Sequence, residues 1–238
     1  MKKGRKAMKK LTHYLAALSL AALVLSGCSA EKAPVKEAHE AASEQSSQVE
    51  ASSKADQKAS AEEVAAAKER IKGLNSVIPV IGAVAYPEAD IYVPLFDGLT
   101  EENMLHGAST FFPGEQKLGQ GNYPITSHNM NYFGENLLLT PILDKTKMGD
   151  SIYVTDLDKI YRFEVDFNEV VPETRVDLVD PKTDHAMLTL MTCTKALGDD
   201  PNRKIVQAKL VDTIDFDQAD PETLDLFKAE YRDVEHIY

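Results

Sequence analysis

From residue 77 onwards the sequence is a series of short segments rich in β-branched and aromatic residues, and this feature constrains the fold most strongly. Each segment has the length and composition of a β-strand, and prolines and turn residues interrupt the series. Strands are predicted at 77–86, 91–96, 123–128, 151–155, 159–171, 187–193 and 204–211. So many short strands with long connections favour a mainly β fold closed into a barrel over a sheet of alternating strands and helices.

One helix is predicted on either side of the strands. Before them, Ser60 and Glu63 form a capping-box pair, and Gly73 lies near the end of the helix. Apolar residues recur at helical spacing in this segment, at Val64, Ala67, Ile71 and Leu74. After the strands, a C-terminal helix is predicted at 221–234, with Asp220 as its cap and Pro221 in its first position.

The amino terminus has the layout of a secretory signal, in which a basic segment precedes an apolar run at 14–25. The run is about twelve residues long, whereas a membrane-spanning helix needs about twenty. It ends in Leu25-Ser26-Gly27-Cys28, which resembles the bacterial lipobox, whose cysteine is lipidated and becomes the new amino terminus. We predict a signal peptide at 1–28 with lipid on Cys28; the alternative is an uncleaved signal anchor with an incidental cysteine. Both alternatives place the chain at the extracytoplasmic face of the membrane.

Residues 29–61 have the composition of a disordered tether. They include nine Ala and seven Ser and contain no Leu, Ile, Phe, Tyr, Trp or Gly, so they cannot bury enough apolar surface to fold. The predicted folded domain is therefore 62–238, with a barrel core at about 77–212 and a C-terminal extension at 213–238.

The folded part of the chain is strongly acidic. Residues 73–238 hold 13 basic and 29 acidic side chains, a net charge of −16, whereas residues 1–72 carry +4. A domain of this charge would repel a phosphate backbone, so nucleic acid is not expected as a partner. The charge would favour a cationic partner, although it also serves solubility.

The motifs of several enzyme classes are absent from the sequence. There is no His-Glu-x-x-His, Cys-x-x-Cys or EF-hand pattern, so no metal site is predicted. A Gly-x-Ser-x-Gly elbow and a glycine-rich phosphate loop are also missing. We predict no cofactor.

Cys193 is the candidate nucleophile, with a buried structural cysteine as the alternative. It is the only cysteine besides Cys28, and it ends a predicted strand at a loop. A nucleophilic thiol needs a proton acceptor and a group that stabilises an oxyanion. His128 ends one predicted strand and Arg203 begins another, so adjacent strands can bring the three residues to one rim. Spacing alone leaves open whether they meet.

Several segments resemble the sortase family, in the order in which that family has them. Residues 189–193, Thr-Leu-Met-Thr-Cys, resemble its Thr-Leu-x-Thr-Cys signature, and 202–206 is similar to its arginine-bearing strand. Residues 121–128 resemble the segment that leads to its histidine, and 81–87 and 105–110 look like its early strands. The resemblance covers about 77–212 and is greatest to class A.

This resemblance implies a closed eight-stranded β-barrel with short helices, and a cysteine transpeptidase that recognises a Leu-Pro-x-Thr-Gly sorting signal on surface proteins. It assigns the nucleophile to Cys193, proton transfer to His128 and oxyanion or backbone binding to Arg203. It further implies that Thr192 contacts the substrate and that Pro172 and Leu178 wall the Leu-Pro pocket. The implied acceptor is an amino group of a peptidoglycan precursor or wall peptide.

The sequence also departs from the family. Ser127 precedes the histidine where many relatives have Gly, and a lipobox stands where class A members usually keep a spanning anchor. Between Thr110 and His128 only Glu115 is acidic, so no calcium site is predicted. Two alternatives stay open: a thiol peptidase that mainly hydrolyses, and a non-catalytic lipoprotein that binds a wall component.

Overall fold

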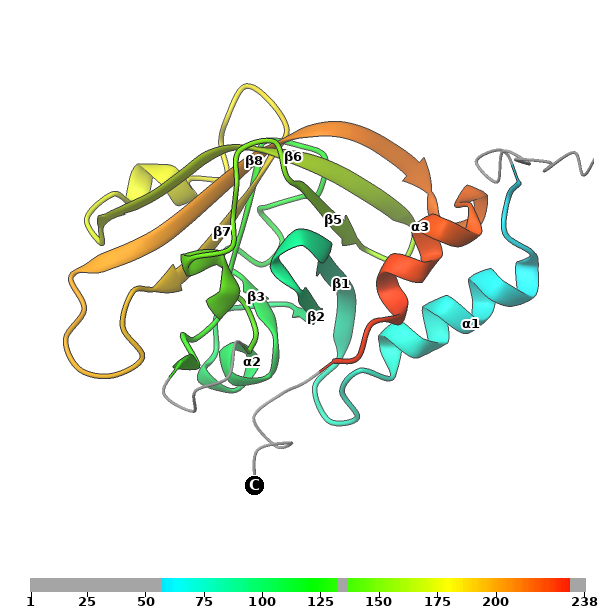
Figure 1. The fold of residues 1–238 in the computed structure, drawn as a ribbon, viewed down its shortest axis with the longest axis horizontal. Coiled ribbons are helices and arrows are strands. Elements are labelled where there is room, and N and C mark those ends of the chain that lie inside the picture. The colour runs from blue at the N-terminus through cyan, green and yellow to red at the C-terminus, as the bar shows by residue number, and fades with distance from the viewer. Residues whose placement is uncertain (1–56, 132–136, 232–238) are drawn as a thin grey trace, which may run out of the picture. The chain divides into compact units, whose positions relative to one another are not determined.

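The computed structural model describes residues 57–131 and 137–231 (Figure 1). The chain divides into two units, Met1–Glu50 and Ala51–Tyr238, and every described residue belongs to the second. The predicted signal peptide, Cys28 and most of the predicted tether therefore lie outside the described residues, as does the end of the predicted C-terminal helix. No helix in the described part of the chain is long and apolar enough to cross a membrane.

Eight strands close into a barrel in the order β1-β2-β3-β4-β7-β8-β6-β5. Their bounds are β1 Val80–Tyr86, β2 Ile91–Phe96, β3 Ala108–Thr110, β4 Asn122–Thr126, β5 Ser151–Thr155, β6 Lys159–Pro172, β7 Met187–Cys193 and β8 Asn202–Asp215. Most neighbours are antiparallel, but β2–β3 and β4–β7 are parallel. The prediction of a mainly β, closed eight-stranded barrel is confirmed.

The barrel interior is filled by one side-chain face of each strand. On β7 and β8 the inner face includes Leu188, Leu190, Val206 and Ala208, all of which belong to the main apolar core. Side chains alternate along a strand, so the residues between these positions face outward. Cys193 is one of the outward residues, at the last position of β7.

Near the predicted site, β4 ends earlier than expected and β3 was not predicted from its residue pattern. β4 ends at Thr126, so His128 lies two residues beyond the strand rather than at its end. The three-residue β3 was not found by periodicity, since so short a segment shows no alternation. It lies parallel to β2, and α2 (Glu101–His106) connects the two strands.

A second apolar core packs against the outside of β1. Helix α1 (Ala61–Lys72) begins at the predicted capping box, since Ser60 Oγ accepts from Glu63 N and the Glu63 carboxylate accepts from Ser60 N. Its buried face meets the segment that follows β8. That segment holds η6 (Phe216–Gln218), α3 (Pro221–Asp225) and η7 (Leu226–Lys228), which pack beside α1 (Figure 1).

The prediction of one continuous helix over 221–234 is wrong. Asp220 caps α3 as expected, with its carboxylate accepting from Thr223 N at 2.9 Å, but the α-helix ends at Asp225. Phe227 leaves helical geometry, at φ −99° and ψ 18°, and its ring is fully buried against Tyr92. Burial of this aromatic ring thus overrides the local helical pattern.

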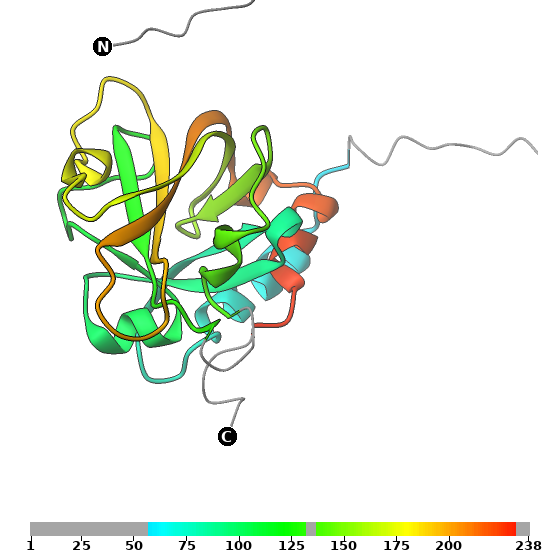
Figure 2. The same ribbon diagram turned by 60° about the vertical axis from the view of Figure 1, so that its left-hand side comes forward.

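In the described residues the remaining connections include the short 3-10 helices η2 (Pro87–Ala89), η4 (Thr140–Leu143) and η5 (Val176–Val179). The last of these lies in the long connection from β6 to β7. Figures 1 and 2 show that the chain enters α1 on the side of the domain opposite the β7–β8 connection. The attachment point of the preceding segment and the end of β7 are therefore well separated.

Candidate active site

Strand register brings His128, Cys193 and Arg203 to one edge of the barrel. In the parallel pair β4–β7, Thr126 pairs with Met191, and a spacing of 65 residues holds along the whole ladder. His128 and Cys193 are separated by the same 65 residues, so continuing this register past β4 places them level. In the antiparallel pair β7–β8, Cys193 lies directly opposite Arg203, and paired side chains share one face.

Three side-chain hydrogen bonds fix the histidine segment to β7. Thr126 Oγ1 donates to Met191 O at 3.0 Å, and Thr192 Oγ1 donates to Ser127 O at 3.0 Å. Asn129 Nδ2 donates to Cys193 O at 2.8 Å. The bonds flank His128 on both sides, so its backbone position is tied to that of the cysteine.

Thr192, for which the resemblance implies a substrate contact, lies on the inner face of β7, and its role in substrate binding remains a prediction. It faces the barrel interior with Leu190, its side chain is fully buried, and its hydroxyl is used by Ser127 O. In this structure Thr192 joins the two segments that carry His128 and Cys193.

Ser127, which replaces the more usual Gly, is a further link. Its hydroxyl accepts from Leu139 N at 3.1 Å and donates to His128 O at 3.2 Å. The side chain is buried, so it joins the histidine segment to the connection that follows. The departure from the family pattern therefore adds hydrogen bonds that glycine cannot make.

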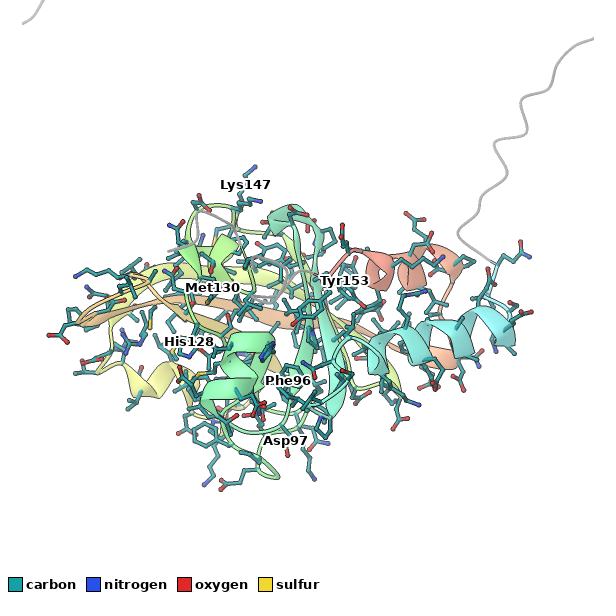
Figure 3. All side chains as sticks on the ribbon, turned by 90° about the horizontal axis from the view of Figure 1, so that it is seen from below. Phe96, Asp97, His128, Met130, Lys147 and Tyr153 are labelled. Carbon is teal, nitrogen blue, oxygen red and sulfur yellow. The ribbon has the colours of Figure 1, made fainter. Side chains whose placement is uncertain are left out.

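Helix α2 supports His128 from the other side (Figure 3). His128 N donates to Met104 O at 3.1 Å, and His128 Nε2 lies 3.2 Å from Glu101 Oε1. Glu101 is in the first turn of this helix, which Thr100 caps. The Glu101 carboxylate is thus placed beside the imidazole. The imidazole is 31% exposed, but its Nε2 atom is buried.

Cys193 is a free, half-buried cysteine whose environment holds it as a thiol. Burial raises the pKa of this thiol, Arg203 opposes that effect, and the nearby carboxylates of Asp200 and Glu173 add to it. Because the thiolate is the nucleophile, a proton acceptor has to assist. His128 is the titratable base that the register brings to the same level.

The backbone N–H after the cysteine is already used. Thr194 N donates to Asp200 Oδ2 at 2.6 Å, so it is not available to an oxyanion. Arg203 is therefore the principal donor on this side of Cys193. Its Nη1 donates to Asp200 O at 2.6 Å and to Asn202 O at 2.8 Å, and its Nη2 lies 3.0 Å from Glu173 Oε2.

Asp200 organises the whole β7–β8 connection. Its carboxylate accepts from the backbone of Thr194, Lys195 and Asn202 and from the Thr194 hydroxyl, at 2.6–3.1 Å. Partial burial raises the pKa of Asp200, but these hydrogen bonds outweigh it and the net pKa is lowered. The connection that joins Cys193 to Arg203 is thus built around one ionised carboxylate.

The two predicted pocket residues lie on the β6–β7 connection and its approach. Pro172 is exposed, ends β6 and pairs with Asn202, next to Arg203. Leu178 is partly exposed in η5, and its carbonyl accepts from Asn122 Nδ2 at 3.0 Å and Gln207 Nε2 at 3.1 Å. These bonds fix the connection over the outward face of β7 and β8. Their role in substrate binding remains a prediction.

Four polar residues of the site were not identified from the sequence: Glu101, Asn129, Glu173 and Asp200. All four lie in connections or in the first turn of a short helix, where no periodic pattern marks them. Thr100 followed by two acidic residues is the signal that could have located α2. Among residues 57–131 and 137–231, no group of three or more His, Cys, Asp or Glu side chains is placed to hold a metal ion.

Comparison with known proteins adds an independent line of support. A family model described as the sortase domain matches residues 84–211, which include Cys193, His128 and Arg203. Sortase A of Listeria monocytogenes is 40% identical over 116 residues, which make up 49% of this chain and 50% of that protein. Sortase A of Streptococcus agalactiae is 33% identical over 159 residues, or 66% of this chain and 63% of that protein.

The fold agrees with these matches. The crystal structure of Listeria monocytogenes sortase A aligns with a TM-score of 0.58 and 32% identity, covering 63% of this chain and 99% of that one. The chain spans half to just under two thirds of the length of the two curated relatives.

Proposed function

Because the chain belongs to the sortase family, we propose that it is an extracytoplasmic cysteine transpeptidase. It cleaves an LPXTG-like sorting signal between Thr and Gly and transfers the surface protein to an amino group of peptidoglycan or its precursor. One observation carries this proposal. The register of three adjacent strands brings a thiol, an imidazole and a guanidinium to the same edge of the barrel.

The chemistry follows from the roles of these three groups. His128 takes the proton of the Cys193 thiol as the sulfur attacks the Thr carbonyl carbon of the signal, and Arg203 stabilises the negative charge that develops on the carbonyl oxygen. The C–N bond to Gly then breaks, and His128 donates its proton to the departing amine. This leaves a thioester on Cys193.

In the second half of the reaction the proton moves in the opposite direction, from the incoming amine to His128. An acceptor amine attacks the thioester carbonyl, His128 takes a proton from that amine, and the sulfur leaves as the new amide forms. A net charge of −16 over residues 73–238 favours the approach of a cationic acceptor. The proposed Leu-Pro pocket lies between Pro172 and Leu178, on the outward face that also carries Cys193.

We further propose that lipid on Cys28 anchors the enzyme and that residues 29–61 tether it. The entry of the chain into α1 on the side opposite the β7–β8 connection supports this arrangement, because the catalytic edge then faces away from the attachment point (Figure 1). Intact-mass measurement of membrane-extracted protein tests it. A mature chain that starts at Cys28 with added diacylglycerol is expected, and one that still starts at Met1 would contradict the proposal.

Cleavage of a quenched Leu-Pro-x-Thr-Gly peptide, with and without an amine acceptor, tests the activity. The wild-type chain should cleave the peptide and form the amide product, whereas Cys193→Ala should do neither. Hydrolysis that the amine does not divert would indicate the mainly hydrolytic thiol peptidase. An unreactive Cys193 with no cleavage would favour the wall-binding lipoprotein.

A further inference from the structure

The contacts of Arg203 point to a positioning role for Glu173, and this inference rests on the proposed function. We infer that Glu173 is a latch: in the free enzyme it holds Nη2 of Arg203, and it gives up that contact when the substrate carbonyl arrives at Cys193. Glu173 is thus a residue that acts through Arg203 and takes no part in bond making.

The geometry of the guanidinium separates a fixed part from a releasable part. Nη1 donates to two backbone carbonyls of the β7–β8 connection, Asp200 O and Asn202 O, which hold the group in place. Nη2 contacts the Glu173 carboxylate, whose side chain is 52% exposed. The substrate carbonyl can therefore replace Glu173 at Nη2 without displacing the guanidinium from its two carbonyl partners.

The backbone next to Glu173 keeps the latch in reach of Arg203. Glu173 N donates to Pro201 O at 2.8 Å, which joins the start of the β6–β7 connection to the end of the β7–β8 connection. The adjacent ladder pair, Pro172 with Asn202, continues this link. Replacing the Glu173 carboxylate therefore removes one side-chain contact and leaves the backbone arrangement intact.

The charged and titratable groups around Cys193 come from four elements. They are Arg203 on β8, Asp200 in the β7–β8 connection, Glu173 after β6 and His128 after β4. Arg203 favours the thiolate, whereas the two carboxylates favour the thiol. Glu173 disfavours the thiolate twice, by its own charge and by pairing with Arg203.

Glu173→Gln tests the latch, and Glu169→Gln is the matched control. Glu169 is exposed on β6, four residues before Glu173, and pairs with Ile205, two residues from Arg203, so its replacement removes the same charge without touching the guanidinium. The readout is the pH dependence of Cys193 alkylation by iodoacetamide, which needs no substrate. We expect Glu173→Gln to move the alkylation midpoint to lower pH and to speed alkylation at pH 7 about two- to tenfold.

The direction of the shift in the alkylation midpoint distinguishes a contact that Arg203 releases from a contact that Arg203 needs to keep its position. If Glu173 were needed to hold Arg203 beside the thiol, Glu173→Gln would move the midpoint to higher pH and slow alkylation. The inference would be overturned by that result, by an unchanged alkylation midpoint in Glu173→Gln, or by an equal shift of the midpoint in Glu169→Gln. Sorting-peptide cleavage by Glu173→Gln should equal or exceed that of the wild type. Failure of every variant to cleave peptide would count against the proposed function, while the alkylation result would still decide the latch.

Discussion

The substitution Thr192→Val tests whether the Thr192 hydroxyl joins two segments of the protein or contacts the substrate. Val keeps the shape of the side chain but removes the hydroxyl that donates to Ser127 O at 3.0 Å. Both residues are buried, so the Ser127 carbonyl loses a partner that water cannot readily replace. Leaving a buried group unpaired costs about 1–3 kcal/mol. For a domain of this size that corresponds to a fall in Tm of roughly 2–12 °C.

The catalytic consequence follows from the position of the lost bond. Ser127 immediately precedes His128, and Thr192 immediately precedes Cys193, so the bond fixes the separation of the two reacting groups. A shift of about 1 Å in such a pair can cost about 100-fold in rate. We therefore expect Thr192→Val to lower kcat by about 10- to 100-fold, with little change in KM.

Thr189→Val is the matched control. Thr189 is fully buried on the same strand, four residues before Cys193, and its hydroxyl lies 2.8 Å from Asn122 Oδ1 and 3.3 Å from Leu178 O. It should lose similar stability yet keep kcat. Thermal unfolding and peptide-cleavage kinetics of both variants provide the comparison. An unchanged Tm with a raised KM in Thr192→Val would refute the structural role and support the substrate contact that the resemblance implies.

Three further substitutions test other parts of the site. Arg203→Lys should lose about 10²–10³ in turnover, because an ammonium cannot hold two carbonyls and an oxyanion together; Lys195→Ala, exposed in the same connection, should keep wild-type turnover. Glu101→Gln should lower turnover by up to about fivefold at neutral pH, because the contact with His128 is made by an exposed carboxylate. Lys204→Met should keep or gain stability at pH 7, because burial lowers the pKa of this lysine. At pH values between the lowered pKa of the folded state and the ordinary value of 10.5, the unfolded chain binds a proton on Lys204 that the folded chain does not bind. The stability of the wild type relative to Lys204→Met should therefore rise with pH in this range.

Most of the barrel could be predicted from local patterns. The predicted strands 91–96, 151–155 and 187–193 coincide with β2, β5 and β7, because each is a compact apolar run bounded by turn residues. The capping box located the start of α1, because it too is a pattern of residues close together in the sequence. Features decided by tertiary contacts were missed: β3 is defined by its pairing with β2 and β4, and α3 ends early because Phe227 is buried.

The candidate site was only partly accessible from the sequence. The motif around Cys193 identified the reactive residue types, but the groups that control them come from connections. Glu101 contacts His128 from α2, and Glu173 and Asp200 hold Arg203 from two different connections. No spacing rule joins these positions, because their proximity is set by the barrel closure and by the parallel register of β4 with β7.

Alternation along β8 correctly separates Arg203 from Lys204, but alternation does not say which face meets solvent. The sequence alone therefore leaves open whether Lys204 or Arg203 lies inside the barrel. Lys204 shares the inner face with Val206 and is almost fully buried, whereas Arg203 faces outward beside Cys193. The interior of a closed barrel is filled by its own side chains, so a reactive thiol that must meet a peptide has to lie on the outer face. On that face connections can approach the thiol, which is why the charge balance at Cys193 is set by Arg203 of β8 together with the carboxylates of Asp200 and Glu173 from two connections.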